Sequence, residues 1–262
     1  MYTELKKLIE QQRFDDAEVL STKLRLVDPD DKELLELERQ VHNELTKSRL
    51  PGPTYLDWLK HIHVTLHPAN YLEIGVESGQ SLQFAQSPTK AIGIDPSPAI
   101  VHGTNAWVKI FKETSDDFFK NNNVKEILGN YIEFSFIDGL HEYDQVLKDF
   151  INIEHNSAKN TIITLHDIFP AIAATASREW NTFYWAGDTW KIMAILEKYR
   201  SDLTIMTIPA FPTGFGFITN LDPTNTVLTA NFNSIVEEFK NMTYEQYKVV
   251  NLIENNFDNV IL

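Results

Sequence analysis

The chain contains 262 residues, a length that suits one large domain or one domain with a small appendage. Its 23 basic and 37 acidic residues give a formal net charge of −14, a field that repels phosphate backbones and anionic lipids and so disfavours nucleic-acid and membrane partners. The absence of cysteine excludes disulfides, thiolate metal sites and a cysteine nucleophile. Residues 1–25 lack the apolar core of a signal peptide, and no run of 18 apolar residues occurs, so we expect a cytoplasmic protein.

The first 47 residues contain no glycine and place their apolar side chains at helical spacing, with breaks at residues 11–15 and 28–31. Pro29 cannot continue a helix, and Asp30 or Asp31 can cap the helix that follows. The pattern predicts two or three short amphipathic helices.

Part of this segment, RFDDAEVLSTKLRLVDPDD, resembles the second half of a tetratricopeptide repeat. Such repeats usually need at least three copies to bury a continuous core, and only one copy is present here. We therefore expect residues 1–50 to form a helical hairpin that caps its own domain or packs on a second subunit, which favours a homo-oligomer. The residues that match the repeat are Phe14, Ala17, Leu24 and Pro29.

A linker is predicted at residues 48–53 (SRLPGP), so the second domain is expected to span residues 54–262. After a helix from Tyr55 to about Leu66, short apolar strands alternate with helical segments, which is typical of a doubly wound α/β fold with a mostly parallel, Rossmann-like sheet. The turn-rich stretch PAFPTG predicts an antiparallel hairpin at the C-terminal edge of the sheet. The expected strands are Tyr71–Ile74, Ala91–Ile94, Val108–Phe111, Phe134–Ile137, Thr161–Leu165, Leu203–Ile208 and Phe215–Thr219.

The turn after the first of these strands, in YLEIGVESGQS, has the composition of a ligand-binding loop. Glu73 lies near the strand end, Gly75 and Gly79 lie in the turn, and Ser81 begins the next helix. Glycines let the backbone approach a ligand closely, while the first helical N–H groups and the carboxylate add polar contacts. The dinucleotide fingerprint G-x-G-x-x-G is broken at its second and third glycines, which argues against NAD.

A second carboxylate, Asp95, ends the next expected strand, AIGID, 22 residues after Glu73. A carboxylate in this place can accept hydrogen bonds from both hydroxyls of a ribose. The pattern therefore predicts a ligand that contains a ribose.

Together with the later segments FIDGLHEYDQVLKDF and TIITLHDIFP, these motifs resemble class I S-adenosylmethionine-dependent methyltransferases. The resemblance covers about residues 54–220 and extends to small-molecule O-methyltransferases of bacterial natural-product and surface-glycan pathways. It implies S-adenosylmethionine as cofactor and a hydroxyl of a small molecule, a sugar or secondary metabolite, as acceptor. It assigns the methionine part of the cofactor to Glu73, Gly75, Gly79 and Ser81, the ribose to Asp95, and the adenine to Ser115 and Asp116, although Ser115 fits a helix N-cap equally well.

Two pairs of polar residues follow the fourth and fifth expected strands, where parallel strands open into one crevice. Methyl transfer to an oxygen needs an acceptor held in line and relieved of its proton, and His141 is the expected base, with Asp138 and His166 as further catalytic residues. Asp138, His166 and Asp167 could instead hold Mg²⁺, chiefly through the two carboxylates, which stand at the strand ends where catechol-type relatives place metal carboxylates. The sequence departs from those relatives because His166 precedes Asp167 and no asparagine follows it.

Three alternatives stay open. The aromatic residues between positions 180 and 190 form either a lid over the acceptor or part of the core. The protein could be a non-catalytic interaction protein, although Glu73, Gly75, Gly79 and Asp95 occurring together argues against a decayed cofactor fold. It could also be a nucleotide-dependent oxidoreductase, which the broken glycine fingerprint disfavours. The aromatic residues in question are Trp180, Phe183, Tyr184, Trp185 and Trp190.

Overall fold

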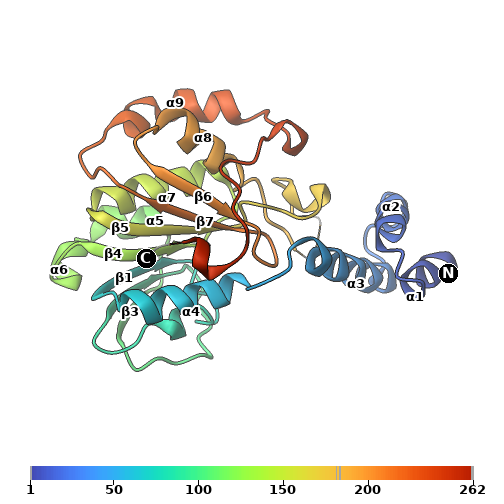
Figure 1. Ribbon diagram of the computed structural model, residues 1–262, viewed down its shortest axis with the longest axis horizontal. Coiled ribbons are helices and arrows are strands. Elements are labelled where there is room, and N and C mark those ends of the chain that lie inside the picture. The colour runs from blue at the N-terminus through green and yellow to red at the C-terminus, as the bar shows by residue number, and fades with distance from the viewer. Residues whose placement is uncertain (1, 181, 183, 261–262) are drawn as a thin grey trace.

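The computed structural model describes residues 2–180, 182 and 184–260. It combines a seven-stranded sheet, helices on both faces of that sheet, and a group of three N-terminal helices (Figure 1). The strands are β1 (Asn70–Ile74), β2 (Lys90–Ile94), β3 (Trp107–Phe111), β4 (Ile132–Ile137), β5 (Ser157–His166), β6 (Thr204–Ile208) and β7 (Phe215–Thr219).

The strand order is β3-β2-β1-β4-β5-β7-β6. The first five strands are parallel, and β7 runs antiparallel to both β5 and β6. This confirms the mostly parallel, Rossmann-like α/β fold with an antiparallel hairpin at its C-terminal edge. Ile74 pairs with Ile94 on one side and with Ile137 on the other, so the loops after β1, β2 and β4 leave the sheet at the same level.

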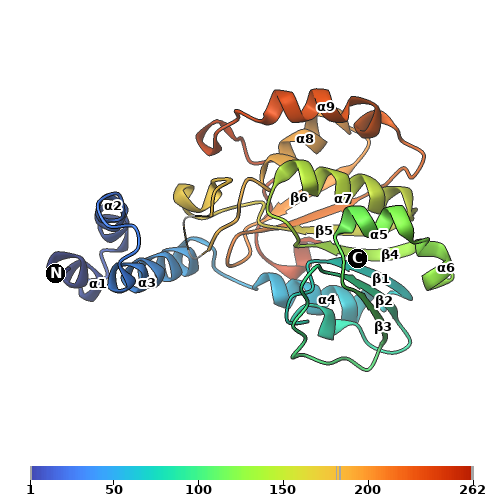
Figure 2. The ribbon, with the colours of Figure 1, turned by 180° about the vertical axis from the view of Figure 1, so that it is seen from behind.

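Two apolar layers enclose the sheet, because its strands bury side chains on both faces. Helices α5 to α9 cover one face, where Leu72 and Ile163 belong to the same buried cluster as Phe150 and Leu196 (Figure 2). Helix α4 and the C-terminal segment cover the other face around Trp58. The helices of the sheet domain are α4 (Tyr55–Leu66), α5 (Ser115–Asn121), α6 (Val124–Leu128), α7 (Tyr143–His155), α8 (Lys191–Tyr199) and α9 (Val227–Phe239).

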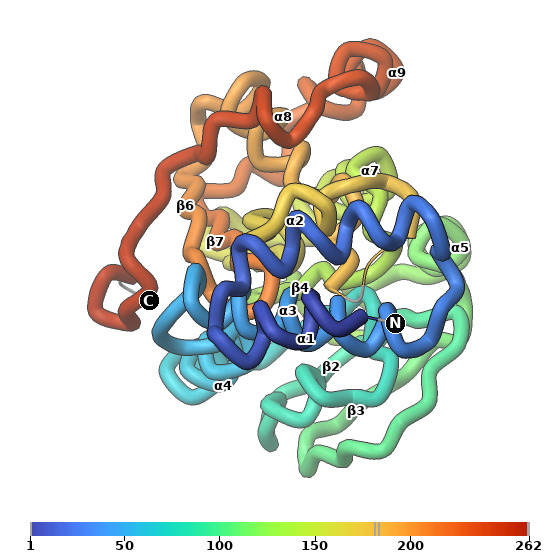
Figure 3. Tube along the Cα trace, turned by 90° about the vertical axis from the view of Figure 1, so that its right-hand side faces the viewer, coloured from blue at the N-terminus to red at the C-terminus, as the bar shows by residue number. Residues whose placement is uncertain are grey.

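The three N-terminal helices extend from one end of the sheet domain (Figures 1 and 3). Asp31 caps the third helix by accepting a hydrogen bond from the Leu34 N–H at 2.8 Å, as one of the two expected caps. The apolar faces of the three helices bury one another, and Ile172 of the sheet domain joins their cluster. None of the helices in the described part of the chain is long and apolar enough to span a membrane. The N-terminal helices are α1 (Thr3–Glu10), α2 (Phe14–Arg25) and α3 (Lys32–Arg49).

Candidate active site

A cavity of about 770 Å³ opens at the carboxyl ends of the parallel strands. This is the place where open α/β sheets bind ligands, because the loops that follow neighbouring strands converge there. We divide its wall into a first half, from the loops after β1, β2 and β3, and a second half, from the loops after β4 and β5. The first half includes Gly75, Asp95, Ser115 and Asp116, and the second includes Asp138, His141, His166 and Asp167.

The first half begins at Gly75, a position that requires glycine for two reasons. Its φ of +87° lies in the left-handed region. A Cβ at this position would lie 1.8 Å from the carbonyl oxygen of Asp138, so the turn passes directly against the backbone of the second half. The close approach at Gly75 is therefore to the backbone that follows β4, and it joins the two halves; the predicted close approach to a ligand stays a prediction.

Glu73 lies behind this turn and is fully buried. Its carboxyl oxygens accept hydrogen bonds from the Tyr71 hydroxyl at 2.6 Å and the Ser81 hydroxyl at 2.5 Å. Burial raises the pKa of Glu73 to about 8, although both hydroxyls favour its charged form. Glu73, Ser81 and Gly79 are not among the residues that line the cavity, so Glu73 supports the turn from below and their direct contact with a ligand stays a prediction.

Asp95 lines the cavity with a carboxylate that the backbone holds in place. Its Oδ2 accepts a hydrogen bond from the Glu77 N–H at 2.8 Å, and its Oδ1 accepts one from the Ser97 N–H at 2.6 Å. Each oxygen keeps a lone pair for a further donor. The arrangement can therefore receive a pair of ligand hydroxyls without reorganising.

Ser115 and Asp116 lie at the start of α5 and also line the cavity. Gln145 of α7 ties them together through Nε2, at 3.2 Å from the Ser115 hydroxyl and 3.0 Å from the Asp116 carboxylate. The alternative role of Ser115 as helix N-cap is wrong, because Thr114 is the cap and its hydroxyl accepts a hydrogen bond from the Asp117 N–H.

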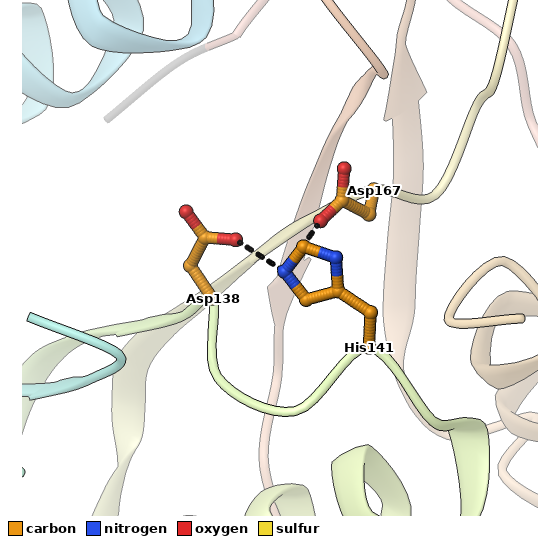
Figure 4. A group of neighbouring side chains, drawn as sticks. All are labelled: Asp138, His141 and Asp167. Carbon is orange, nitrogen blue, oxygen red and sulfur yellow. Dashed lines mark ion pairs between the residues drawn. The ribbon is translucent and has the colours of Figure 1, made fainter. Parts of the chain in front are cut away.

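The second half brings together four titratable side chains from two strand ends. Asp138 and His141 follow β4, and His166 and Asp167 end β5. The carboxylates of Asp138 and Asp167 point at the imidazole of His141 (Figure 4). Asp167 adopts a φ of +61°, a left-handed conformation that non-glycine residues adopt mainly at turns and functional sites.

The surroundings of His141 show that one of its ring nitrogens, Nδ1, carries a proton. Its Nδ1 lies 2.9 Å from the carbonyl oxygen of Trp185, and a carbonyl can only accept, so Nδ1 carries a proton. Nε2 then faces the Asp167 carboxylate at 3.2 Å and the Asp138 carboxylate at 3.6 Å. A bare lone pair would repel both, so this nitrogen and the carboxylates need a cation between them, either a second proton or a metal ion.

The pKa values follow from these contacts. Burial disfavours the charged imidazole of His141, but the carboxylates of Asp167 and Asp138 outweigh it and raise its pKa to about 9. Burial likewise opposes ionisation of Asp138, and His166 and His141 nevertheless hold its pKa well below its usual range. The cluster therefore favours a charged Asp138 carboxylate and a cationic partner.

His166 is in a different state because both of its nitrogens meet acceptors. Nδ1 lies 3.2 Å from the Asp138 carboxylate, and Nε2 lies 3.2 Å from the Thr213 hydroxyl. That hydroxyl donates to Asp167 at 2.5 Å, so its oxygen is free to accept from His166. Although burial opposes the charge, Asp167 and Asp138 raise the pKa of His166 to about 10. His166 is therefore a buried cation that positions both carboxylates, and it is poorly suited to take a proton.

Two residues of this half were absent from the sequence predictions. The ring of Tyr55, at the start of α4, packs on the His166 ring with 4.0 Å between centroids. Thr213, in the turn between β6 and β7, orients Asp167 and His166. Neither belongs to a motif, and the antiparallel hairpin that carries Thr213 was the only available signal.

The same cluster has the ligands of a metal site. Within the described residues, Asp138, His141 and Asp167 each offer one ligand atom, and these atoms lie within 4.8 Å of one another. The structure thus brings together the two carboxylates predicted to bind Mg²⁺, and the imidazole grouped with them is that of His141 and not that of His166. Carboxylates suit Mg²⁺ and Mn²⁺, whereas an imidazole ligand suits zinc or iron better.

The aromatic segment divides between the two expected roles. Tyr184 and Trp185 line the cavity, and the Trp185 ring stacks on His141 at 5.0 Å. Trp190 is buried in the core, whereas Trp180 is 79% exposed. Phe183 lies outside the described residues. Tyr184 and Trp185 are therefore the described residues of this segment that border the cavity, and the lid stays a prediction.

Comparisons with known proteins agree with this architecture. Residues 72–168 match the family model of a methyltransferase domain. That match leaves the tetratricopeptide resemblance of the N-terminal helices without support. No curated protein sequence matches the chain at a significant level.

Solved structures show the same fold. The SAH-bound methyltransferase PaMTH1 of Podospora anserina is 19% identical with a TM-score of 0.51, over 69% of this chain and 86% of that chain. The O-methyltransferase TomG from Streptomyces achromogenes, involved in tomaymycin synthesis and in complex with SAM, is 13% identical with a TM-score of 0.50, over 78% and 96% of the two chains. Residues 72–168 are therefore similar to a methyltransferase domain, and the chain has a Rossmann-like fold.

Proposed function

We propose that the protein transfers the methyl group of S-adenosylmethionine to a hydroxyl of a small molecule, a sugar or secondary metabolite. One observation carries this proposal: a single cavity joins the carboxylate of Asp95 to the acid–base cluster around His141. The Asp95 carboxylate is suited to bind a nucleoside. The cluster around His141 is suited to accept the proton of an acceptor hydroxyl.

The first half fits the cofactor in size and in chemistry. A cavity of about 770 Å³ is within the range of about 300 to 1,000 Å³ that is usual for small-molecule sites. Asp95 would accept the ribose hydroxyls, Ser115 and Asp116 would face the adenine, and the turn at Gly75 would lie against the methionine part. Glu73 and Ser81 would hold that turn from behind the wall, and the contact of Glu73, Gly79 and Ser81 with the methionine part stays a prediction.

His141 would take the acceptor's proton through Nε2 in the fraction of molecules in which that nitrogen is unprotonated, a fraction that grows as the pH approaches the His141 pKa of about 9. A sulfonium already activates the methyl group, so the protein has to place the acceptor oxygen in line with it and remove the proton from that oxygen. The Nδ1–H bond to Trp185 fixes the orientation of the His141 ring, and His166 lies against the carboxylates of Asp138 and Asp167 beside it. The rings of Tyr184 and Trp185 would cover the acceptor and exclude water.

A divalent cation would be held by Asp138 and Asp167, with His141 within reach as a third ligand. Such an ion would lower the pKa of the acceptor hydroxyl. It would also supply the positive charge between the carboxylates and Nε2 in place of the second proton on His141, and an ion bound to Nε2 would make His141 a ligand and not the base.

The direct test is the ligand itself. We expect the purified protein to carry S-adenosylhomocysteine or S-adenosylmethionine, detectable by mass spectrometry after denaturation, and to bind added S-adenosylhomocysteine in calorimetry. Protein stripped of ligand that then shows no heat of binding for either compound would contradict the proposed function.

A further inference from the structure

The segment between β5 and α8 connects the N-terminal helices with the cavity. We define it as the bridging loop, residues 167–190. At one end, Ile172 is buried among the apolar side chains of the N-terminal helices, and Arg49 of α3 donates a hydrogen bond to the Ala171 carbonyl at 2.7 Å. Further along, the Tyr184 hydroxyl donates to Oδ1 of Asn43 at 2.7 Å. Helix α3 therefore holds this loop at two separate places.

The other side of the bridging loop holds His141. The Trp185 carbonyl accepts the His141 Nδ1–H bond at 2.9 Å, and the Asp188 N–H donates to the His141 carbonyl at 3.1 Å. Gly187 lies between them with a φ of +59°, and a Cβ there would lie 1.8 Å from the His141 carbonyl oxygen. The loop is thus hydrogen-bonded to both the side chain and the backbone of His141.

The contacts of the bridging loop with helix α3 and its contacts with His141 are made by adjacent residues. Tyr184 is held by Asn43, and Trp185 supplies the carbonyl that fixes which nitrogen of His141 carries the proton. Asn43 is half-buried on α3 and is not part of the cavity wall, so it has no role in binding a ligand there. Its own amide Nδ2 donates to Glu44 at 2.9 Å, which leaves Oδ1 as the atom that Tyr184 requires.

We propose that Asn43 is a positioning residue for the methyl transfer: through Tyr184 and the Trp185 carbonyl, helix α3 fixes the orientation of His141. The N-terminal helices thereby belong to the catalytic machinery although they do not touch the cavity's ligand. This inference rests on the proposed function, in which Nε2 of His141 must face the acceptor.

The measurement is made on the Nδ1 proton of His141. A hydrogen-bonded imidazole N–H gives a downfield proton resonance coupled to ¹⁵N, and Nδ1–H is present whether or not Nε2 is also protonated. The resonance is assigned by its absence in His141→Asn. In Asn43→Ala we expect this proton to exchange with water at least tenfold faster than in the parent protein, or to be lost from the spectrum.

Two further variants separate positioning from general damage. Asn43→Asp keeps an acceptor oxygen for Tyr184 and should retain the protected proton. Gln40→Ala removes an exposed amide from the same helix and should change nothing. Thermal unfolding confirms that each variant folds, and if Asn43→Ala does not, Tyr184→Phe removes the same hydrogen bond from the other partner.

The inference is wrong if Asn43→Ala, or Tyr184→Phe in its place, protects the proton as well as Gln40→Ala does, or if Asn43→Asp loses it too. S-adenosylhomocysteine affinity, which we expect to stay within about threefold in all these variants, reports on the proposed function separately. Binding with an unchanged Nδ1 proton in Asn43→Ala would overturn only the role of Asn43. No binding in the parent protein would overturn the function.

Discussion

The two halves of the cavity are built by different means. In the first half, the carboxylate of Asp95 is satisfied by backbone N–H groups, which keep the same charge at any pH. In the second half, Asp138, His141, His166 and Asp167 satisfy one another, so the charge of each depends on the others. In the proposed function, the first half therefore binds its ligand with fixed backbone dipoles, whereas the second half reacts by transferring protons.

The largest effect should come from the second half. Replacing His141 by alanine removes the proposed base and should lower turnover by roughly two to four orders of magnitude, while S-adenosylhomocysteine affinity stays nearly constant. Turnover and calorimetry on the same preparation would check both statements. An active variant would transfer the proton-accepting role to another group, and a variant that fails to bind the cofactor would show that the halves are not separable.

Removal of divalent cations should act on the same half. Because Asp138 and Asp167 would hold the ion, an excess of EDTA should lower turnover at least tenfold, and Mn²⁺ or Mg²⁺ should restore it. Calorimetry with S-adenosylhomocysteine in EDTA provides the control, since the first half needs no ion. Full turnover in EDTA would leave the second proton on His141 as the cation of the cluster.

The first half is tested at Asp95. Asp95→Ala should weaken S-adenosylhomocysteine binding by about 1 to 3 kcal/mol, because it removes charge-assisted hydrogen bonds to the ribose. Asp116→Ala, a carboxylate on the same wall without the predicted ribose contact, should cost less. Equal affinities for the parent protein and Asp95→Ala would exclude this carboxylate from the ribose site.

One group of the first half should nevertheless respond to pH. The pKa of Glu73 is raised to about 8 in the folded protein from about 4.5, so the folded state holds its proton more tightly and this contribution to stability declines as the pH rises from 4.5 through 8. Glu73→Gln cannot ionise and should flatten the decline over that interval. Thermal unfolding of both proteins at several pH values is the measurement, and parallel curves would show that Glu73 is not the source.

The smallest effect on cofactor binding should follow from deleting residues 1–50. S-adenosylhomocysteine affinity should remain within a few-fold, because Asp95, Ser115 and Asp116 form hydrogen bonds within the sheet domain. We also expect fewer subunits in light scattering, because the N-terminal helices keep exposed apolar side chains that suit a subunit contact. Loss of cofactor binding without a change in subunit number would mean that the helices are integral to the first half. These exposed side chains are Val19, Leu26, Val27 and Leu35.

The division between the halves also explains how much the sequence could reveal. The strands, the turn at Gly75 and the place of Asp95 follow from local patterns, since Asp95 and its donor Glu77 lie only 18 residues apart. The state of His166 depends on Thr213, 47 residues away, and no local pattern connects them. The orientation of His141 depends on a backbone carbonyl, that of Trp185, which any residue could supply.

Burial was the other property that the sequence did not reveal. Glu73 was predicted to meet the cofactor because a carboxylate in a glycine-rich turn usually faces the ligand. Tyr71 precedes it by two residues on the same strand, and a period of two puts both side chains on one face, where the Tyr71 hydroxyl captures the carboxyl group. That interaction could have been expected from the alternation of the strand alone.

The hairpin that carries Thr213 has a consequence for how the protein is made. The first half is complete in sequence by Asp116, whereas the second half needs a residue about 100 positions later. At about 5 to 20 residues per second, a ribosome takes roughly 5 to 20 s to synthesise that interval. During synthesis the chain therefore possesses every residue of the proposed cofactor half well before it can assemble the group that moves the proton.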